Sequence, residues 1–402
     1  NGAGAFGASI NLETNRLNEK PYAETILTAG SFNTLRNTVA AGTGLIGNKF
    51  SFDARASRIT SDGFVDRAFS RLHSYYLSAG WYGKKSVLKL INFFGIVKTY
   101  QAWNLVPQDT LEAGNRTYNE LGQFTDEQGR LLHYDDQTDN YSQNNWHLHY
   151  VGQLGSRLSL NVTGHYTKGK GYYEEYKEDQ DFDAYGLVRP VLIFNDSAIE
   201  FSGTTDLIRR RWLDNDFAGG IFNVSYRFSR AFSATLGGGY NSYFGKHFGR
   251  VMWMHFAGDA APDHQYYFNT ANKNDANIYL KASWQPLEDL SFFADLQGRR
   301  VEYSFLGPDN RDTLHQQRRV LEFFNPKAGV SYRLSGALSI YGSAAVGNKE
   351  QNRNDFVENK PANQPKHETM LDIEAGFRMN SRLLRSAINF YSMEYRNQLV
   401  LN

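Results

Sequence analysis

The 402-residue sequence lacks several features that would place it in common protein classes. It has no cysteine, which excludes a disulfide framework, a zinc–cysteine site and a thiol nucleophile. Its 43 Lys and Arg residues balance 42 Asp and Glu residues, so the basic excess of a nucleic-acid-binding protein is missing. The longest apolar stretch, from Val87 to Val97, is interrupted by Lys89 and Asn92, and it cannot form a transmembrane helix of about 20 residues. With nine prolines and 15% aromatic residues, the composition is not that of a disordered protein.

The main pattern that is present is an alternation of apolar and polar residues with a period of two. Leu158, Leu160 and Val162 alternate with Ser159 and Asn161, and the pattern recurs near positions 222–228, 292–299, 338–344 and 371–378. Successive strand residues point to opposite faces, so each segment predicts a strand with one apolar and one polar face. The polar face includes Asn161, Thr163, His165, Asn223, Arg227, Asp295, Gln297, Arg299, Asp372 and Glu374.

The predicted strands are long, and their connections have two lengths. Many reach ten residues, which is enough to cross a bilayer as tilted barrel strands. Short turns such as 83–85 and 335–337 alternate with polar loops at about 99–144, 168–208, 244–274, 304–319 and 349–366. The stretch 247–270 has room for one further strand pair. We predict fifteen strands, at 22–31, 34–44, 48–59, 71–82, 86–98, 145–154, 157–168, 212–228, 231–243, 275–285, 289–303, 320–334, 337–347, 367–379 and 382–396.

These features predict an all-β fold, a transmembrane antiparallel β-barrel. Short turns at one end and long loops at the other are typical of outer-membrane barrels. Lipid offers no hydrogen-bonding partner to a free strand edge, and bacterial single-chain barrels have even strand counts. Fifteen strands therefore form an incomplete barrel, and we expect further strands after Asn402 and a further domain before Asn1.

The first residues contain a glycine pattern that has two interpretations. Gly2, Gly4 and Gly7 match the GxGxxG spacing of dinucleotide-binding loops, but no strand precedes them and no helix follows. The segment instead resembles the closing strand of the plug domain of TonB-dependent outer-membrane transporters, which ends near "INIxTK". The matching positions are Gly4, Gly7, Ile10, Asn11 and Thr14. Segments 245–253, 324–334 and 395–400 also resemble barrel segments of this family in Bacteroidetes-type bacteria.

The resemblance implies an architecture and a mechanism. It implies a 22-stranded barrel that is partly represented here, with residues 1–18 as the end of an N-terminal plug domain and residues 19–402 as the barrel domain. It also implies an outer-membrane protein, in contact with outer-membrane lipid, that imports a scarce ligand when the TonB–ExbB–ExbD energy complex acts on the plug. The segment that contacts TonB would precede residue 1.

The sequence of the predicted plug end resembles that of receptors for metal chelates. The expected ligand is therefore a metal chelate: a ferric siderophore, haem or cobalamin. The alternative is a SusC-like oligosaccharide importer, which would work with a surface lipoprotein. A passive porin, an adhesin barrel and a soluble β-propeller or sandwich are further alternatives. No G-x-S-x-G or H-E-x-x-H motif is present, so we predict no enzyme, no catalytic residue and no cofactor.

Aromatic side chains in the predicted outer loops are the candidate ligand contacts. Rings offer flat apolar surface at low entropic cost, which suits porphyrins, corrins, catecholates and sugars. An aromatic girdle at the membrane interface is the other interpretation. An acidic run at 174–183 lacks the spacing of a calcium loop, so we predict a solvated loop there and no metal site. The candidate ligand-binding residues are Tyr172, Tyr173, Tyr176, Trp253, His255, Tyr266 and Tyr267.

Overall fold

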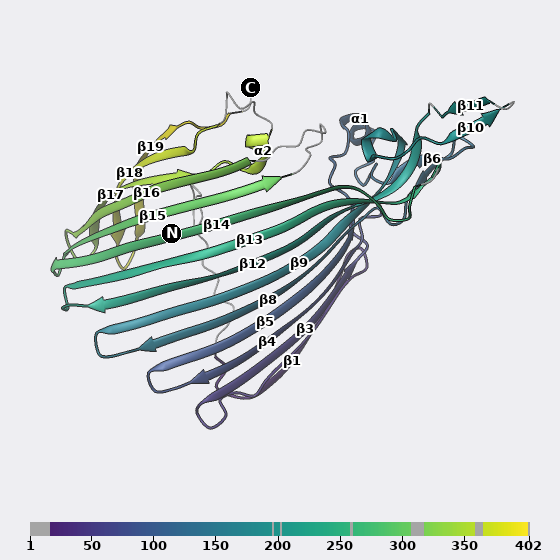
Figure 1. The fold of residues 1–402 in the computed structure, drawn as a ribbon. Helices are drawn as coiled ribbons and strands as arrows, with labels where there is room; N and C mark the ends of the chain where they lie inside the picture. Colours follow the sequence, from purple (N-terminus) through teal and green to yellow (C-terminus); the bar gives the residue numbers. More distant parts are fainter. Residues whose placement is uncertain are drawn as a thin grey trace.

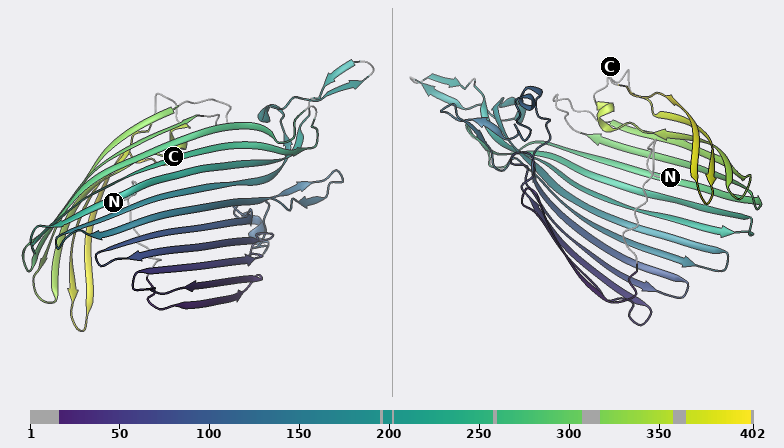
Figure 2. Two further views of the ribbon diagram at one scale, coloured as in Figure 1. Left: turned by 60° about the horizontal axis from the view of Figure 1, so that its bottom comes forward. Right: turned by 180° about the vertical axis from the view of Figure 1, so that it is seen from behind.

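The protein is represented by a computed structural model, which describes residues 17–194, 197–201, 203–257, 260–306, 317–357 and 365–400. One 15-stranded antiparallel sheet dominates it and curves like the wall of a barrel (Figures 1 and 2). Its strands follow each other in sequence order, so every neighbour in the sheet is also a neighbour along the chain. The strands are β1 (Tyr22–Gly30), β2 (Thr34–Gly42), β3 (Phe50–Ser61), β4 (Ser70–Tyr82), β5 (Ser86–Tyr100), β8 (Thr138–Gln153), β9 (Leu158–Gln180), β12 (Thr205–Arg227), β13 (Phe232–Met254), β14 (His264–Leu287), β15 (Leu290–Leu306), β16 (Gln317–Arg333), β17 (Leu338–Lys349), β18 (Glu368–Asn380) and β19 (Arg385–Arg396).

The remaining elements are short and lie in the long loops at one end of the sheet, whereas the other end has short turns (Figure 1). The prediction of fifteen sheet strands joined by two classes of connection is therefore confirmed. Within the described ranges, no helix has the length and apolar character needed to cross a membrane. The short elements are α1 (Gln108–Glu112), the hairpin β6 (Gln123–Thr125) and β7 (Leu131–His133), a 3-10 turn (Asp183–Tyr185), the hairpin β10 (Val191–Phe194) and β11 (Ser197–Glu200), and α2 (Arg353–Val357).

The two faces of the sheet are inverted relative to a water-soluble protein. On the outer face, large apolar side chains are exposed, and Ile278 and Phe324 expose 57% and 59% of their surface. On the inner face, polar side chains are buried, and Gln297 and Arg299 expose only 6% and 5%. The strand register places the polar residues predicted for the interior on this inner face. A wall between lipid and an enclosed polar interior requires this arrangement.

Four strands are much longer than the sequence predicts. β9, β12 and β13 each have 23 residues and β14 has 24, against 9 for β1 and for β2. The predicted loops at 168–208 and 244–274 are wrong where β9, β12, β13 and β14 extend through them. The stretch 247–270 is not a separate strand pair but contains the outer ends of β13 and β14 and the connection between them. Beyond the apolar belt both faces carry a mixture of charged and aromatic residues, so the alternation fades although the backbone hydrogen bonds continue.

Residues 1–16 lie outside the described residues. The predicted plug-strand positions Gly4, Gly7, Ile10, Asn11 and Thr14 all belong to that segment, as does almost all of the predicted plug end at 1–18. The predicted division of the chain at residue 18 is therefore still a prediction.

Candidate ligand-binding site

The outer ends of β9, β12, β13 and β14 form a wall that extends beyond the shorter strands (Figures 1 and 2). On its inner face, four residues pair across the four strands in one row: Tyr173 with Arg211, Arg211 with Gly249, and Gly249 with Tyr267. Directly paired residues in a sheet bring their side chains together. Three aromatic or cationic side chains and one glycine therefore share a single patch of the interior wall.

Arg211 is at the centre of this patch, between two tyrosine rings. Its guanidinium carbon lies 5.5 Å from the ring centre of Tyr173 and 5.8 Å from that of Tyr267, both within the range of cation–π attraction. Its Nε donates a hydrogen bond of 3.4 Å to the Tyr267 hydroxyl. Among the described residues, no carboxylate forms an ion pair with Arg211. The guanidinium therefore keeps donor capacity for an anionic group from outside the protein.

Gly249 makes room for the tyrosines. A Cβ atom at this position would lie 2.3 Å from the Tyr266 and Tyr267 rings, which is closer than any side chain tolerates. Because glycine has no Cβ atom, the Tyr266 and Tyr267 rings can lie directly over the β13 backbone at Gly249. On the other side of the patch, the exposed Trp103 from the 101–137 loop meets the Tyr173 ring edge-on, with ring centres 5.4 Å apart and an angle of 85°. Aromatic rings from β9 and β14 thus border Arg211, and Trp103 from the loop packs on one of these rings, Tyr173.

A second arginine one row further out has a different environment. Arg209 forms an ion pair of 2.8 Å with Glu175 and donates a 2.9 Å hydrogen bond to the Tyr185 hydroxyl. Tyr185 belongs to a loop that folds onto the inner face and joins a small apolar core with Leu207 and Val251. Burial raises the pKa of Tyr185, so its hydroxyl remains protonated. Arg209 therefore anchors the loop, and Arg211 below it faces the interior.

The structure divides the predicted ligand contacts between the two faces of the wall. Tyr173, Tyr266 and Tyr267 lie on the inner face around Gly249. Tyr172 lies on the outer face and packs on Trp212 with ring centres 4.5 Å apart. The remaining predicted residues pack among themselves and with loop residues near the outer end: Tyr176 with Trp253 at 6.2 Å, and Trp253 with His255 at 6.3 Å.

Sequence reasoning missed Arg211, Gly249 and Trp103. The run Arg209–Arg210–Arg211 was an available signal, because three consecutive arginines in a strand place the first and third on the same face. The predicted solvated acidic loop is also wrong in part. Glu174 and Glu175 are buried within β9, paired with Arg210 and Arg209. Among the residues that the structure describes, no group of three or more His, Asp or Glu side chains is arranged to hold a metal ion.

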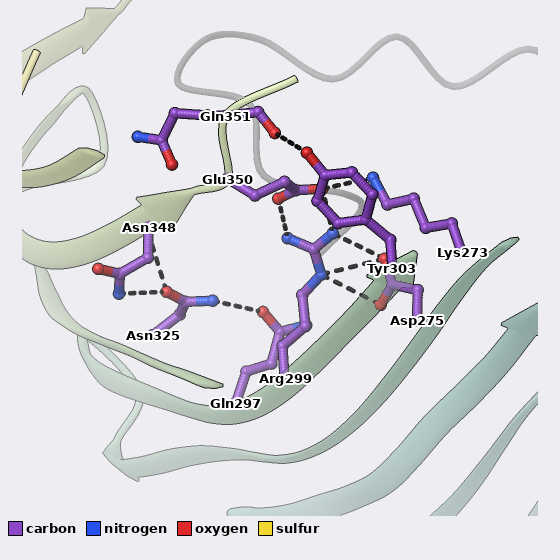
Figure 3. Close-up of polar contacts among 9 residues, drawn as sticks. All are labelled: Lys273, Asp275, Gln297, Arg299, Tyr303, Asn325, Asn348, Glu350 and Gln351. Carbon is purple, nitrogen blue, oxygen red and sulfur yellow. Dashed lines mark hydrogen bonds and ion pairs between the residues drawn. The ribbon is translucent and has the colours of Figure 1, made fainter. Parts of the chain in front are cut away.

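A second polar cluster lies on the inner face of β14, β15 and β16, and Figure 3 shows it. Arg299 donates hydrogen bonds to Asp275 at 2.7 Å and to Glu350 at 2.8 Å, and Lys273 donates to Glu350 at 2.9 Å. Beside it, the Asn325 amide donates to Gln297 at 3.1 Å. Every charge in this cluster has an opposite partner, so the cluster joins strands to one another.

Glu350 connects this cluster to the next loop, because it directly follows β17. Burial alone would raise the pKa of its carboxyl, but hydrogen bonds from Arg299 and Lys273 outweigh burial and lower the pKa to about 2. In the same region, Phe356 of α2 packs on Tyr303 of β15. The start of the 350–367 connection is therefore held against the inner face by ionic and apolar contacts.

Comparisons with known proteins agree with this architecture. A family model described as "TonB dependent receptor-like, beta-barrel" matches residues 74–402. The chain belongs to this family. TonB-dependent receptors are located in the bacterial outer membrane, so the predicted localisation and family are confirmed. A search of curated proteins finds no match.

Solved structures share the fold at low sequence identity. The pyoverdine outer membrane receptor FpvA from Pseudomonas aeruginosa PAO1 has a TM-score of 0.69 and 14% identity, over 98% of this chain and 56% of that one. The copper transporter OprC has a TM-score of 0.67 and 11% identity, over 95% and 55%. The ferric citrate transporter FecA has a TM-score of 0.65 and 12% identity, over 96% and 53%. The chain thus spans about half the length of these structures, and the likeness shows the fold alone.

Proposed function

We propose that this protein is part of a TonB-dependent importer and that its ligand is a metal chelate, such as a ferric siderophore, haem or cobalamin. The observation that carries the ligand class is Arg211, held between Tyr173 and Tyr267 on the inner wall. Chelates of this kind present anionic oxygens together with flat aromatic or conjugated surfaces. A guanidinium without a carboxylate partner can bind the anionic oxygens, and tyrosine rings can stack on the flat surfaces.

The inner wall supports transport of a polar solute past this site. Asn161 donates a 2.7 Å hydrogen bond to Asn223, and His165 lies 2.7 Å from the Asn241 amide oxygen. Side chains that hydrogen-bond to one another in this way form a polar, hydrated surface. Few of their donors and acceptors are left to bind a passing ligand tightly. We infer that energy from the TonB–ExbB–ExbD complex releases the ligand from the outer site into this interior.

An oligosaccharide importer is the second candidate. Trp103 is 56% exposed and stands beside Tyr173, and aromatic platforms of this kind also stack on sugar rings. A surface lipoprotein partner would accompany this function. The cationic centre favours the chelate, because a neutral sugar has no group that matches the charge of Arg211. A passive porin would need no binding site of this type.

Ligand titration and growth assays test the proposal together. The purified receptor in detergent is titrated with a ferric catecholate, haem, cyanocobalamin and a neutral oligosaccharide, with quenching of tryptophan fluorescence as the readout. A deletion strain is then grown on each compound, with and without a functional tonB gene. We expect saturable binding of a chelate, and we expect growth on that chelate to require both the gene for this receptor and the tonB gene. Binding of the oligosaccharide alone, or uptake that persists without TonB, would contradict the proposal.

A further inference from the structure

Three of the ten histidines of the chain lie together on the inner face of β8 and β9. His147 and His149 are two residues apart in β8 and therefore share a face, and His165 of β9 pairs directly with His147. The sequence shows only the pair in β8, and the strand register adds the third imidazole. His165 precedes Tyr173 by eight residues along β9, so the cluster is about 26 Å from the patch around Arg211.

Hydrogen bonds orient two of these three rings. His165 Nε2 lies 2.7 Å from the Asn241 side-chain oxygen, which can only accept, so Nε2 carries the hydrogen and Nδ1 of the neutral ring keeps its lone pair. In His149, the tautomer in which Nδ1 donates to the Thr163 hydroxyl at 3.0 Å keeps the lone pair on Nε2. A metal-binding histidine almost always donates its second ring N–H to an oxygen in this way. Both rings therefore have the outer hydrogen bond that is typical of a metal ligand.

His147 is the ring that is free to turn. Among the described residues it has ring contacts, with Phe93 at 5.3 Å and with His149 at 5.6 Å between ring centres, but no hydrogen-bond partner. Two imidazoles bound to one tetrahedral metal ion at about 2.1 Å have ring centres about 5.5 Å apart. The separation of His147 and His149 therefore suits a shared ion, although their planes are inclined by 87° and the three rings do not surround one point. Rotation of His147 about its side-chain bonds, which no hydrogen bond opposes, is the movement that metal binding requires.

The donor set decides which ions fit this cluster. Imidazole nitrogens suit copper, nickel and zinc, whereas calcium and magnesium prefer oxygen ligands. Lys89 of β5 pairs with His149, and its positive charge opposes a dication, so the ion that is highest in the Irving–Williams order is favoured. We propose that His147, His149 and His165 bind one divalent transition-metal ion on the interior wall, with Cu²⁺ preferred over Ni²⁺ and Zn²⁺. The site takes the bare ion, with water in the remaining positions, and does not depend on a chelate at Arg211.

Copper titration of the full-length receptor in detergent tests this proposal. The protein is purified without a polyhistidine tag and stripped of metal, and Cu²⁺ is added in competition with a chelator of known affinity while electron paramagnetic resonance is recorded. We expect one bound Cu²⁺ whose spectrum shows nitrogen hyperfine coupling from imidazole. Asn241→Leu removes the outer hydrogen bond of His165 and should lower the copper affinity by about tenfold. His147→Asn removes a ligand itself, so it should weaken the nitrogen coupling and lower the affinity by more than about tenfold.

The matched control is His247→Asn. His247 also lies on the inner face, in β13, but its directly paired neighbours are Leu213 and Asn269, which carry no imidazole. Copper affinity of this variant should equal that of the unmodified protein. Unchanged affinity in His147→Asn would overturn the proposal, and so would equal losses in His147→Asn and His247→Asn, since they would show that copper binds histidines without regard to their grouping. Circular dichroism confirms that each variant keeps its strand content.

Discussion

Two arginines on the same inner wall, Arg211 and Arg299, have opposite surroundings. Arg299 is 3% exposed at its side chain and binds two carboxylates, those of Asp275 and Glu350. Arg211 binds no carboxylate among the described residues and lies between two tyrosine rings. The same residue type on the same sheet face therefore serves two purposes. Arg299 is neutralised and holds strands and a loop together, whereas Arg211 is bordered by rings and is the arginine that we propose binds a ligand.

The comparison also separates stability from binding. Removal of one member of a buried ion pair leaves its partners charged and desolvated, which is costly for folding. Removal of a partly exposed arginine with no ion partner costs little stability. If Arg211 binds the ligand as we propose, its removal also eliminates a charge-assisted hydrogen bond to that ligand. Variants at the two positions should therefore affect different measurements, and the following predictions are ordered by the size of the expected effect.

Arg299→Gln should have the largest effect, on stability. Asp275 and Glu350 would remain buried without their main partner, and we expect a loss of about 3 kcal/mol in the free energy of unfolding. Thermal unfolding followed by circular dichroism, or the heat-dependent band shift of the barrel on a gel, measures the change. Arg211→Gln is the matched control and should unfold near the temperature of the unmodified protein. Equal destabilisation by both variants would contradict the division between the two sites.

Arg211→Gln should have the next largest effect, on ligand affinity. The loss of a hydrogen bond from a charged donor costs about 1.5–3 kcal/mol, which corresponds to a loss of affinity of about 10- to 100-fold. Arg211→Lys keeps the charge but not the planar fork, so an intermediate affinity is expected. Fluorescence titration with the chelate that binds best measures both. Unchanged affinity in Arg211→Gln would remove Arg211 from the binding site.

Gly249→Ala should have a smaller effect on the same site. The added methyl group would displace the Tyr266 and Tyr267 rings, which lie 2.3 Å from its expected position. Because Tyr266 packs on Tyr185 and cannot move freely, we expect a cost of about 1 kcal/mol and a loss of affinity of about fivefold. Gly298→Ala is a suitable control, because a Cβ atom there would meet nothing closer than 4.0 Å. A larger loss at position 298 than at position 249 would show that the tyrosine geometry is unimportant.

Acidification should have no effect in the physiological range. The folded-state pKa of Glu350 is about 2, below its usual value of 4.5, so the stabilisation is fully present above pH 4.5. It is lost as the pH falls from about 4.5 through 2, because the unfolded state then binds the proton more readily. The thermal midpoint should be constant from pH 7 to pH 5 as far as this group is concerned. In Glu350→Gln, the decline between pH 4.5 and 2 should be shallower.

The sheet was largely predictable, and its outer extensions were not. Strands such as β15 and β18 alternate apolar and polar residues through the bilayer region, because lipid on one side and water on the other impose a period of two. Outside the bilayer both faces of a strand meet water or loops. The sequence of β9 after Lys168 therefore resembles a loop, and only the pairing with β12 reveals that the strand continues to Gln180.

The candidate site was predictable in composition but not in geometry. Tyrosines near 172, 173, 266 and 267 were recognisable as candidate contacts, yet irregular pairing between Gly249 and Arg250 decides which face Tyr266 occupies. Arg211 was missed because nothing in the sequence shows which arginines form ion pairs. In the structure, Arg209 and Arg210 pair with Glu175 and Glu174, and Arg211 pairs with no carboxylate among the described residues. That distinction depends on the alignment of β12 with β9.

By itself, the sequence indicated the class of fold, since alternation over many long segments favours a sheet with lipid on one face and water on the other. The order of its strands and motifs also resembled one family, and the family model that matches residues 74–402 confirms that family. The tertiary structure decided which charged residues neutralise each other, which rings face the interior, and which face lipid. The physical reason is that alternation is a local property of one strand, whereas charge pairing and ring packing depend on the register of strands that are distant in sequence.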